Sequence, residues 1–143
     1  MEHLAIMKKS WKLTSKILSG KKKIESRWYK TKRPPWDLIK SGDIIYFKDS
    51  GDPVTIKTEV EKIVQFSNLN SRKVKEILNV YGRDDGIEEN ETNKFFDLFK
   101  NKKYCILVFL KNSEEIEPFN VNKAGFGAMS AWISVESINQ IKV

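Results

Sequence analysis

Residues 19–29 read SGKKKIESRWY and mark the point at which a helix gives way to a strand. Gly20 is the residue type that most often ends a helix in the left-handed conformation. Beyond it the residues alternate in character, which is typical of a strand whose successive side chains face opposite sides. Glu25 and Arg27 therefore share one face of the predicted strand, and Lys22, at the junction, can swing toward them.

Hydrophobic periodicity and turn residues predict the remaining elements. Strands are predicted at 3–7, 43–48, 55–66, 103–112 and from 131, and helices at 10–19, 71–82 and 90–102. Ser10 and Ser71 are the predicted helix N-caps, and a bulge is expected near Glu61. The strand at 103–112 is the most apolar and should be central, whereas residues 114–130 are expected to be mostly loop.

This order of elements has no regular β-α-β rhythm, which favours an α+β fold over a parallel α/β fold. We expect residues 1–143 to form a single domain. The predicted architecture is a small, mostly antiparallel β-barrel with one early helix and two helices inserted before the last strands. Curling the sheet into a barrel would remove its exposed edges.

The net charge of +7 is concentrated near the start of the chain. Residues 1–40 hold 12 Lys/Arg against 3 Asp/Glu, while the remaining residues hold 14 against 16. Such an asymmetry indicates a polyanionic partner, with RNA or a nucleotide as the leading candidate, although lysines also keep small proteins soluble. The predicted basic surface consists of Lys8, Lys9, Lys12, Lys16, Lys21, Lys23, Lys30, Lys32 and Arg33.

Other features of the chain indicate a cytoplasmic protein. No apolar run approaches the ~20 residues of a membrane span, and the first residues lack the basic-then-apolar layout of a signal peptide. Cys105 is the only cysteine and lies in the apolar run YCILVFL, so we expect a buried, reduced thiol. A monomer is favoured, and no membrane partner or cofactor is expected.

Gly20, Lys22, Glu25 and Arg27 together form the pattern G-x-K-x-x-E-x-R. With the Gly-Asp turn of SGDIIYF (41–47) and the closing segment SAWISVESI, this pattern resembles the ASCH domain, a branch of the PUA-like pseudo-barrel superfamily. The resemblance covers roughly residues 4–138. It implies a small β-barrel with a cleft at whose mouth the motif residues gather, and a role with RNA or modified nucleosides in RNA processing or translation.

One subset of this family resembles amidohydrolases that deacylate a modified cytidine. A lysine of that subset matches Lys22, but a threonine nucleophile occupies the position of Glu25. A carboxylate cannot replace a hydroxyl that attacks an acyl carbon, so the sequence departs from that activity. Other family members carry glutamate at this place, and some have been proposed to be ribonucleases.

Two cations beside Glu25 should lower its pKa and keep it ionised. An ionised carboxylate can accept a hydrogen bond from the exocyclic amine of a base, while Arg27 or Lys22 holds a phosphate or a base carbonyl. Alternatively, Glu25 orients a water for hydrolysis and Lys22 stabilises the oxyanion, which would make both residues catalytic. A third interpretation is an exposed Glu25–Arg27 ion pair worth less than ~1 kcal/mol.

Aromatic residues interleaved with lysines suit base stacking. Trp36, in a proline-rich loop, is the predicted stacking platform, whereas Trp28 is expected to pack in the core. The predicted ligand-binding residues are Lys22, Glu25, Arg27, Trp36, Lys21 and Lys23.

The acidic stretch RDDGIEEN (83–90) is expected to be a solvated, mobile loop. The alternative, which the resemblance to the nucleoside-deacylating relatives implies, is a lid that supplies a second carboxylate to the cleft. The stretch lacks the spacing of an EF-hand, and the chain's single histidine, His3, is expected to be structural or disordered. A metal site and a Ser–His–Asp triad therefore have little support.

Overall fold

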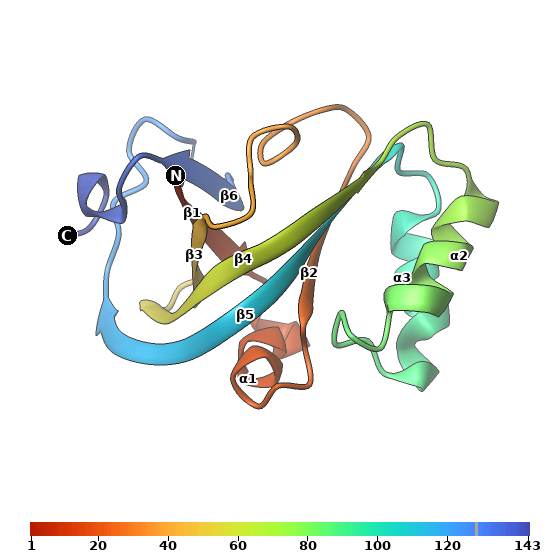
Figure 1. The fold of residues 1–143 in the computed structure, drawn as a ribbon, viewed down its shortest axis with the longest axis horizontal. Coiled ribbons are helices and arrows are strands. Elements are labelled where there is room, and N and C mark those ends of the chain that lie inside the picture. The colour runs from red at the N-terminus through yellow and green to blue at the C-terminus, as the bar shows by residue number, and fades with distance from the viewer. Residues whose placement is uncertain (128) are drawn as a thin grey trace.

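The structure is a computed structural model that describes residues 1–127 and 129–143, and a six-stranded mixed sheet forms its centre (Figure 1). Its strands are β1 (Glu2–Met7), β2 (Ile24–Tyr29), β3 (Ile44–Asp49), β4 (Val54–Phe66), β5 (Tyr104–Phe119) and β6 (Trp132–Val135). The strand order is β2-β5-β4-β3-β1-β6; β1 and β3 are parallel and the other pairs antiparallel. This confirms the α+β class and the mostly antiparallel sheet.

The sheet curls into a half-barrel, and its open edges face each other across a seam. Arg27, on the edge strand β2, donates from Nη2 to the carbonyl of Ile6 on β1 (3.5 Å) and from Nη1 to the carbonyl of Ala131 (3.3 Å). Among the residues that the structure describes, no backbone hydrogen bond crosses the seam at this point, and the side chain of Arg27 bridges it instead.

The helices are α1 (Leu13–Leu18), α2 (Ser71–Tyr81) and α3 (Thr92–Phe99), supplemented by single 3₁₀ turns at Lys9–Trp11, Glu89–Glu91 and Ile138–Gln140. The predicted N-cap at Ser10 is wrong, because Lys12 adopts a left-handed conformation (φ 55°) and separates the first 3₁₀ turn from α1. The predicted cap at Ser71 is also wrong by one residue. Asn70 caps α2 instead, since its side chain accepts a hydrogen bond from the Lys73 amide.

The long antiparallel pair of strands β4 and β5 both confirms and corrects the sequence analysis. The pairing of β4 with β5 shifts between Val60 and Lys62, so the bulge predicted at Glu61 is present. Residues 114–119, however, are not loop: β5 runs on to Phe119 and pairs with the first half of β4. This pairing partner, distant in sequence, stabilises a polar segment that has no strand pattern of its own.

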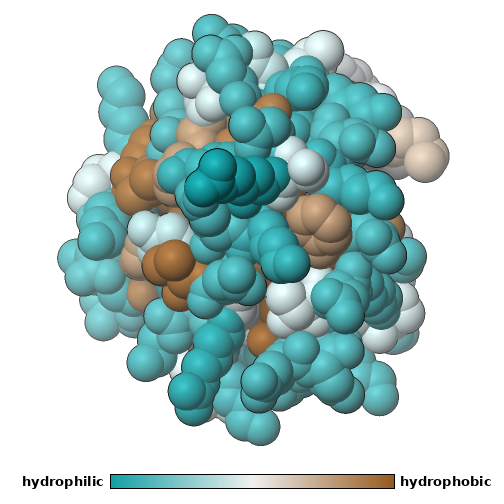
Figure 2. Space-filling model, turned by 90° about the vertical axis from the view of Figure 1, so that its right-hand side faces the viewer, coloured by the Kyte–Doolittle hydropathy of each residue, from teal (hydrophilic) through white to brown (hydrophobic). Residues whose placement is uncertain are grey.

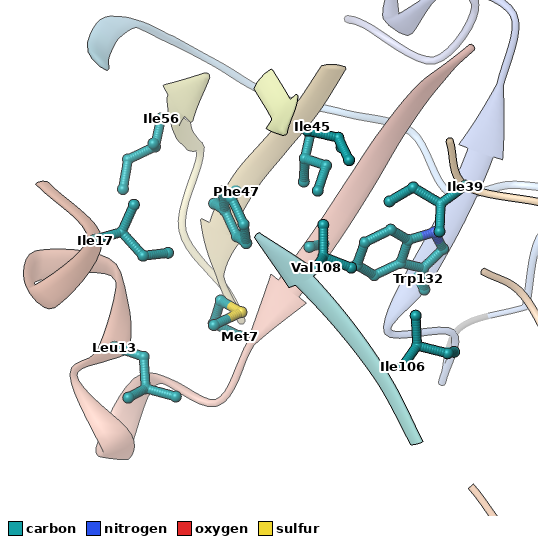
Figure 3. Close-up of a cluster of buried hydrophobic side chains, with 12 residues drawn as sticks. Met7, Leu13, Ile17, Ile39, Ile45, Phe47, Ile56, Ile106, Val108 and Trp132 are labelled. Carbon is teal, nitrogen blue, oxygen red and sulfur yellow. The ribbon is translucent and has the colours of Figure 1, made fainter. Parts of the chain in front are cut away.

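Three hydrophobic clusters hold the fold together. The first fills the barrel beside α1, with Phe47 fully buried at its centre (Figure 3). In the second, α2 and α3 cover one side of the sheet against Trp28, Cys105 and Leu107, so the predicted core position of Trp28 is confirmed. The third joins β1, β3 and β6 to the C-terminal residues.

The face over α2 and α3 is mainly hydrophilic, with small, separate hydrophobic areas (Figure 2). Cys105 is fully buried, and burial raises the pKa of its thiol well above the usual value. Within the described residues, no helix is long and apolar enough to cross a membrane.

His3 on β1 is fully buried and ties this strand to β6 and to the turn before β3. Its Nε2 bonds Asp43 Oδ2 and its Nδ1 bonds Ser134 Oγ, both at 2.8 Å. Trp132 Nε1 donates to the same Nδ1 (3.3 Å), so Nδ1 is the acceptor and Nε2–H is the donor to Asp43. A Ser–His–Asp chain therefore exists, but its imidazole is fully enclosed. The expected structural role of His3 agrees with this position.

Burial lowers the pKa of His3 despite the opposing effect of Asp43. As the pH falls through about 6.5, the unfolded chain takes up a proton that the folded chain does not. We therefore expect the free energy of unfolding to fall between pH 7 and 5, by up to about 1.4 kcal/mol per pH unit. Urea unfolding of the wild type and of His3→Gln measures this; the variant should show a flatter pH dependence, and equal slopes would contradict the assignment.

Candidate functional site

Lys22 lies at the centre of a buried cluster of charged side chains, with 1% of its side chain exposed. Its ammonium lies 2.6 Å from both the carbonyl oxygen and Oδ1 of Asp85, and 3.2 Å from Oε1 of Glu25. An ammonium has three protons, and these three acceptors account for all of them.

Glu25 connects Lys22 to Arg27. Its Oε2 accepts from Nε (3.1 Å) and Nη2 (2.8 Å) of Arg27, so the two side chains share a face as the alternation on β2 predicts. The side chain of Glu25 is only 4% exposed, which makes the interpretation as a surface ion pair wrong. After these contacts Oε1 retains one free acceptor position.

Asp85 is the member of the cluster that the sequence analysis left open. It comes from the acidic loop 83–90, and it is buried rather than solvated, which contradicts the expectation for this residue. The carbonyl of Asp84 accepts from the amides of Lys23 (2.6 Å) and Ile24 (2.9 Å), so the loop is bonded to the start of β2. Gly86 follows with φ +84°, and a Cβ there would lie 3.3 Å from the Lys22 side chain, so glycine permits this close approach.

Ser26 was not predicted as a site residue, because the alternation places it on the face opposite Glu25. Its hydroxyl nevertheless donates to Oδ2 of Asp85 (2.5 Å) and accepts from Nε1 of Trp28 (3.0 Å). Because β2 is an edge strand, residues of both its faces reach the seam. The position of β2 at the edge of the sheet would have identified Ser26 as a site residue, and the alternation of residues along the strand does not reveal that position.

The cluster drives the pKa values of its two carboxyl groups in opposite directions. Burial raises the pKa of Asp85, Glu25 raises it further, and Lys22 only partly offsets these effects. For Glu25 burial also acts upward, but Lys22 and Arg27 outweigh it and lower the pKa. Burial opposes the charge of Lys22, whereas Asp85 and Glu25 raise its pKa above the usual value. Lys22 and Glu25 are therefore both charged near neutral pH.

A cavity of ≈ 200 Å³ opens onto this cluster at the seam of the half-barrel. Its polar floor is formed by Lys22, Glu25, Ser26, Arg27 and Asp85. Its walls are largely aromatic and apolar, formed by Trp11, Trp28, Tyr29, Phe95, Phe99, Ile6, Met7, Leu13, Ile87 and Ala131, with Lys8 beside them. Trp28 and Phe99 stack in parallel at 4.7 Å, and Trp11 meets Phe95 edge-on at 5.1 Å.

Three of the predicted ligand-binding residues do not line this cavity. Lys21 and Lys23 lie on a separate hollow beside Arg83, on the outer side of the same loop junction. Trp36 packs against the first hydrophobic cluster and meets Tyr104 edge-on. The structure thus brings together Lys22, Glu25 and Arg27 and places the other three elsewhere.

The predicted basic surface is partly neutralised by acidic partners. Lys9 pairs with Asp52 (3.0 Å) and Lys16 with Glu88 (3.3 Å). Lys8 instead lies over the ring of Trp11, 5.2 Å from its centroid, at the edge of the cavity.

A curled mixed sheet with α1 packed inside it, α2 and α3 outside it and a cavity at its seam places this chain among small α+β pseudo-barrel domains. The ASCH protein of Zymomonas mobilis is one solved structure with this architecture: it aligns with a TM-score of 0.67 and 20% identity, over 97% of this chain and 91% of that chain. A tyrosine-to-phenylalanine mutant of the same protein aligns with a TM-score of 0.69 and 20% identity, over 97% and 93%. The chain therefore has the ASCH domain fold, as its motif predicts.

A second structure, that of the hypothetical protein PH0355, aligns over 81% of this chain and 100% of that chain, with a TM-score of 0.53 and 24% identity. No protein-family model matches the sequence, and neither does any curated protein. The likeness therefore concerns the fold, and function has to be argued from the site.

The central position of Lys22 can be tested by its removal. Lys22→Met should lower the free energy of unfolding by about 3–5 kcal/mol, because Glu25 and Asp85 would then face each other in a buried site without the cation between them. Urea denaturation measures the loss. The neighbouring, exposed Lys23→Met is the matched control and should change stability by less than about 0.5 kcal/mol.

Adding Asp85→Asn to Lys22→Met should recover part of the lost stability, because it removes one of the two opposed charges. A Lys22→Met variant as stable as Lys23→Met would show that the cluster does not hold the loop.

Proposed function

We propose that this protein binds RNA or a modified nucleoside, with one base in the cavity at the seam, and that it acts in RNA processing or translation in the cytoplasm. The observation that carries the proposal is the composition of the cavity, which combines flat aromatic walls with a floor of paired charges. Single-stranded bases are held by stacking on aromatic rings and by hydrogen bonds to their edges, and this cavity offers groups of both kinds.

The size of the cavity supports a small ligand. At ≈ 200 Å³ it is smaller than the ~300–1,000 Å³ of sites for drug-sized molecules, which suits a single base better than a larger cofactor. The free acceptor position on Oε1 of Glu25 would receive an exocyclic amine. Arg27, 12% exposed at the seam, would hold a carbonyl or phosphate oxygen.

Stacking in the cavity gives a direct test. Trp11→Leu keeps an apolar side chain but removes the flat ring, and we expect it to weaken RNA binding about ten-fold or more, since stacking contributes ~1–3 kcal/mol per base. Trp36→Leu is the matched control, because Trp36 lies outside the cavity. Fluorescence anisotropy with short single-stranded RNA measures both affinities. If only Trp36→Leu lowered the affinity for RNA, the binding site would lie at the proline-rich loop and not in the cavity.

A second candidate function is hydrolysis in the same cavity, and the contact between Ser26 and Asp85 favours it. A hydroxyl 2.5 Å from a carboxylate of raised pKa is the arrangement of a nucleophile with its general base. Ser26 would attack an acyl carbon while Asp85 takes its proton and passes it to the leaving amine, and water would then release the acyl group. Lys22 would stabilise an oxyanion only if it released one of its three present acceptors.

Turnover separates the two functions. If the protein is a hydrolase, Ser26→Ala should abolish the release of acyl groups from a panel of acylated nucleosides while nucleoside binding persists. Thr14→Ala, which removes a hydroxyl that bonds Asp49 and does not line the cavity, should leave the rate unchanged. A wild type that leaves the panel and unmodified RNA intact would reject hydrolysis and leave binding as the function.

A further inference from the structure

A shallow outer groove continues the cavity beyond the seam. It is lined by Lys8, Ser10, Trp11, Lys94, Asp97 and Leu98. Lys8 and Trp11 also line the cavity, so the two hollows meet at these residues. Trp11 thus stands between the enclosed space and the surface of α3.

The outer groove offers an apolar surface of the kind on which a base can lie. Trp11 is half-buried, and Leu98 beside it in the groove is 47% exposed, so both leave apolar surface accessible to a ligand. The indole is fixed by its edge contact with Phe95 at 5.1 Å, so it does not have to be ordered when a ligand arrives.

The groove also offers positive charge that, unlike the charge of Lys22 and Arg27 in the cavity, is not paired with a carboxylate. Among the described residues, neither Lys8 nor Lys94 forms an ion pair with a carboxylate; both lie over aromatic rings, 5.2 Å from the Trp11 centroid and 5.5 Å from the Phe95 centroid. The acid of the groove, Asp97, is paired with Lys100 at 3.5 Å. Two flexible ammonium groups are therefore free to bind an anion.

In the cavity, by contrast, Lys22 has all its protons engaged and Arg27 is paired with Glu25. A free nucleoside in the cavity would leave the outer lysines unused. A nucleotide strand would place a base in the cavity and its phosphate beside Lys8 and Lys94.

We propose that the outer groove is a subsite for the neighbouring nucleotide, so that the ligand of this protein is a strand of RNA rather than a free nucleoside. The inference rests on the proposed function and specifies its substrate. Phosphate contacts fix the position of a strand, while contacts to the base edge select it. The groove performs the first task and the floor of the cavity performs the second.

The test compares single nucleosides with a mixed-sequence RNA hexanucleotide, both titrated by calorimetry between about 50 and 200 mM salt. The wild type should bind the hexanucleotide at least about ten-fold more tightly than any nucleoside, because stacking of even one further base has this effect. Lys94→Ala should reduce the salt slope of hexanucleotide binding by about 0.7, the value for one phosphate contact to a single strand, and leave nucleoside binding unchanged.

Lys75→Ala is the matched control, since Lys75 is an exposed lysine on α2 that lies outside both hollows. A hexanucleotide bound no more tightly than a nucleoside, or equal slopes for Lys94→Ala and Lys75→Ala, would overturn the subsite while the proposed function stands. Polyglutamate bound as tightly as the hexanucleotide would also overturn it. Failure of the wild type to bind either RNA or nucleosides would instead reject the proposed function itself.

Discussion

The ammonium of Lys22 holds together two parts of the chain that are sixty residues apart. Its three acceptors come from Glu25 on β2 and from Asp85 in the loop before α3. Each carboxylate alone would be costly to bury, and together they would repel each other without a cation between them. The floor of the cavity and the buried position of Asp85 depend on this contact, while the bonds of Asp84 to the start of β2 hold the rest of the loop beside it.

The alternation after Gly20 was sufficient to predict three of the five members of the cluster. It placed Glu25 and Arg27 on one face of a strand with Lys22 beside them, because a strand has a period of two whatever surrounds it. It could not supply Asp85, since an acidic loop that folds back onto a lysine has the same composition as one that faces water. It also excluded Ser26. Alternation assigns each residue to one of two faces, and it does not show that residues of both faces line a cavity when the strand lies at the edge of the sheet.

The fold was predictable where local pattern and tertiary environment agree, and unpredictable where distant pairing decides. The bulge at Glu61 and the class of the fold followed from the sequence, whereas the strand at 114–119 exists because β4 is long enough to pair with it. The predicted N-cap of α2 was wrong for a local reason. Asn70 and Ser71 are equally good capping residues, so the sequence does not choose between them. Charge counting likewise located the basic segment, but it could not show that Lys9 and Lys16 are paired with acids from elsewhere in the chain.

The arrangement of charges separates selectivity from affinity at this site. The polar groups of the floor are already bonded to one another, so a ligand gains from them only where its own edge matches the acceptor position that remains on Glu25 or a donor of Arg27. Such a floor rejects a wrong base more effectively than it attracts a correct one, because a mismatched group would leave a buried partner unsatisfied. Attraction must then come from the aromatic walls and from cations outside the floor. The lysines beside Trp11 and Phe95 are suited to this role because ring contacts do not neutralise them, and a ligand phosphate would find them still charged.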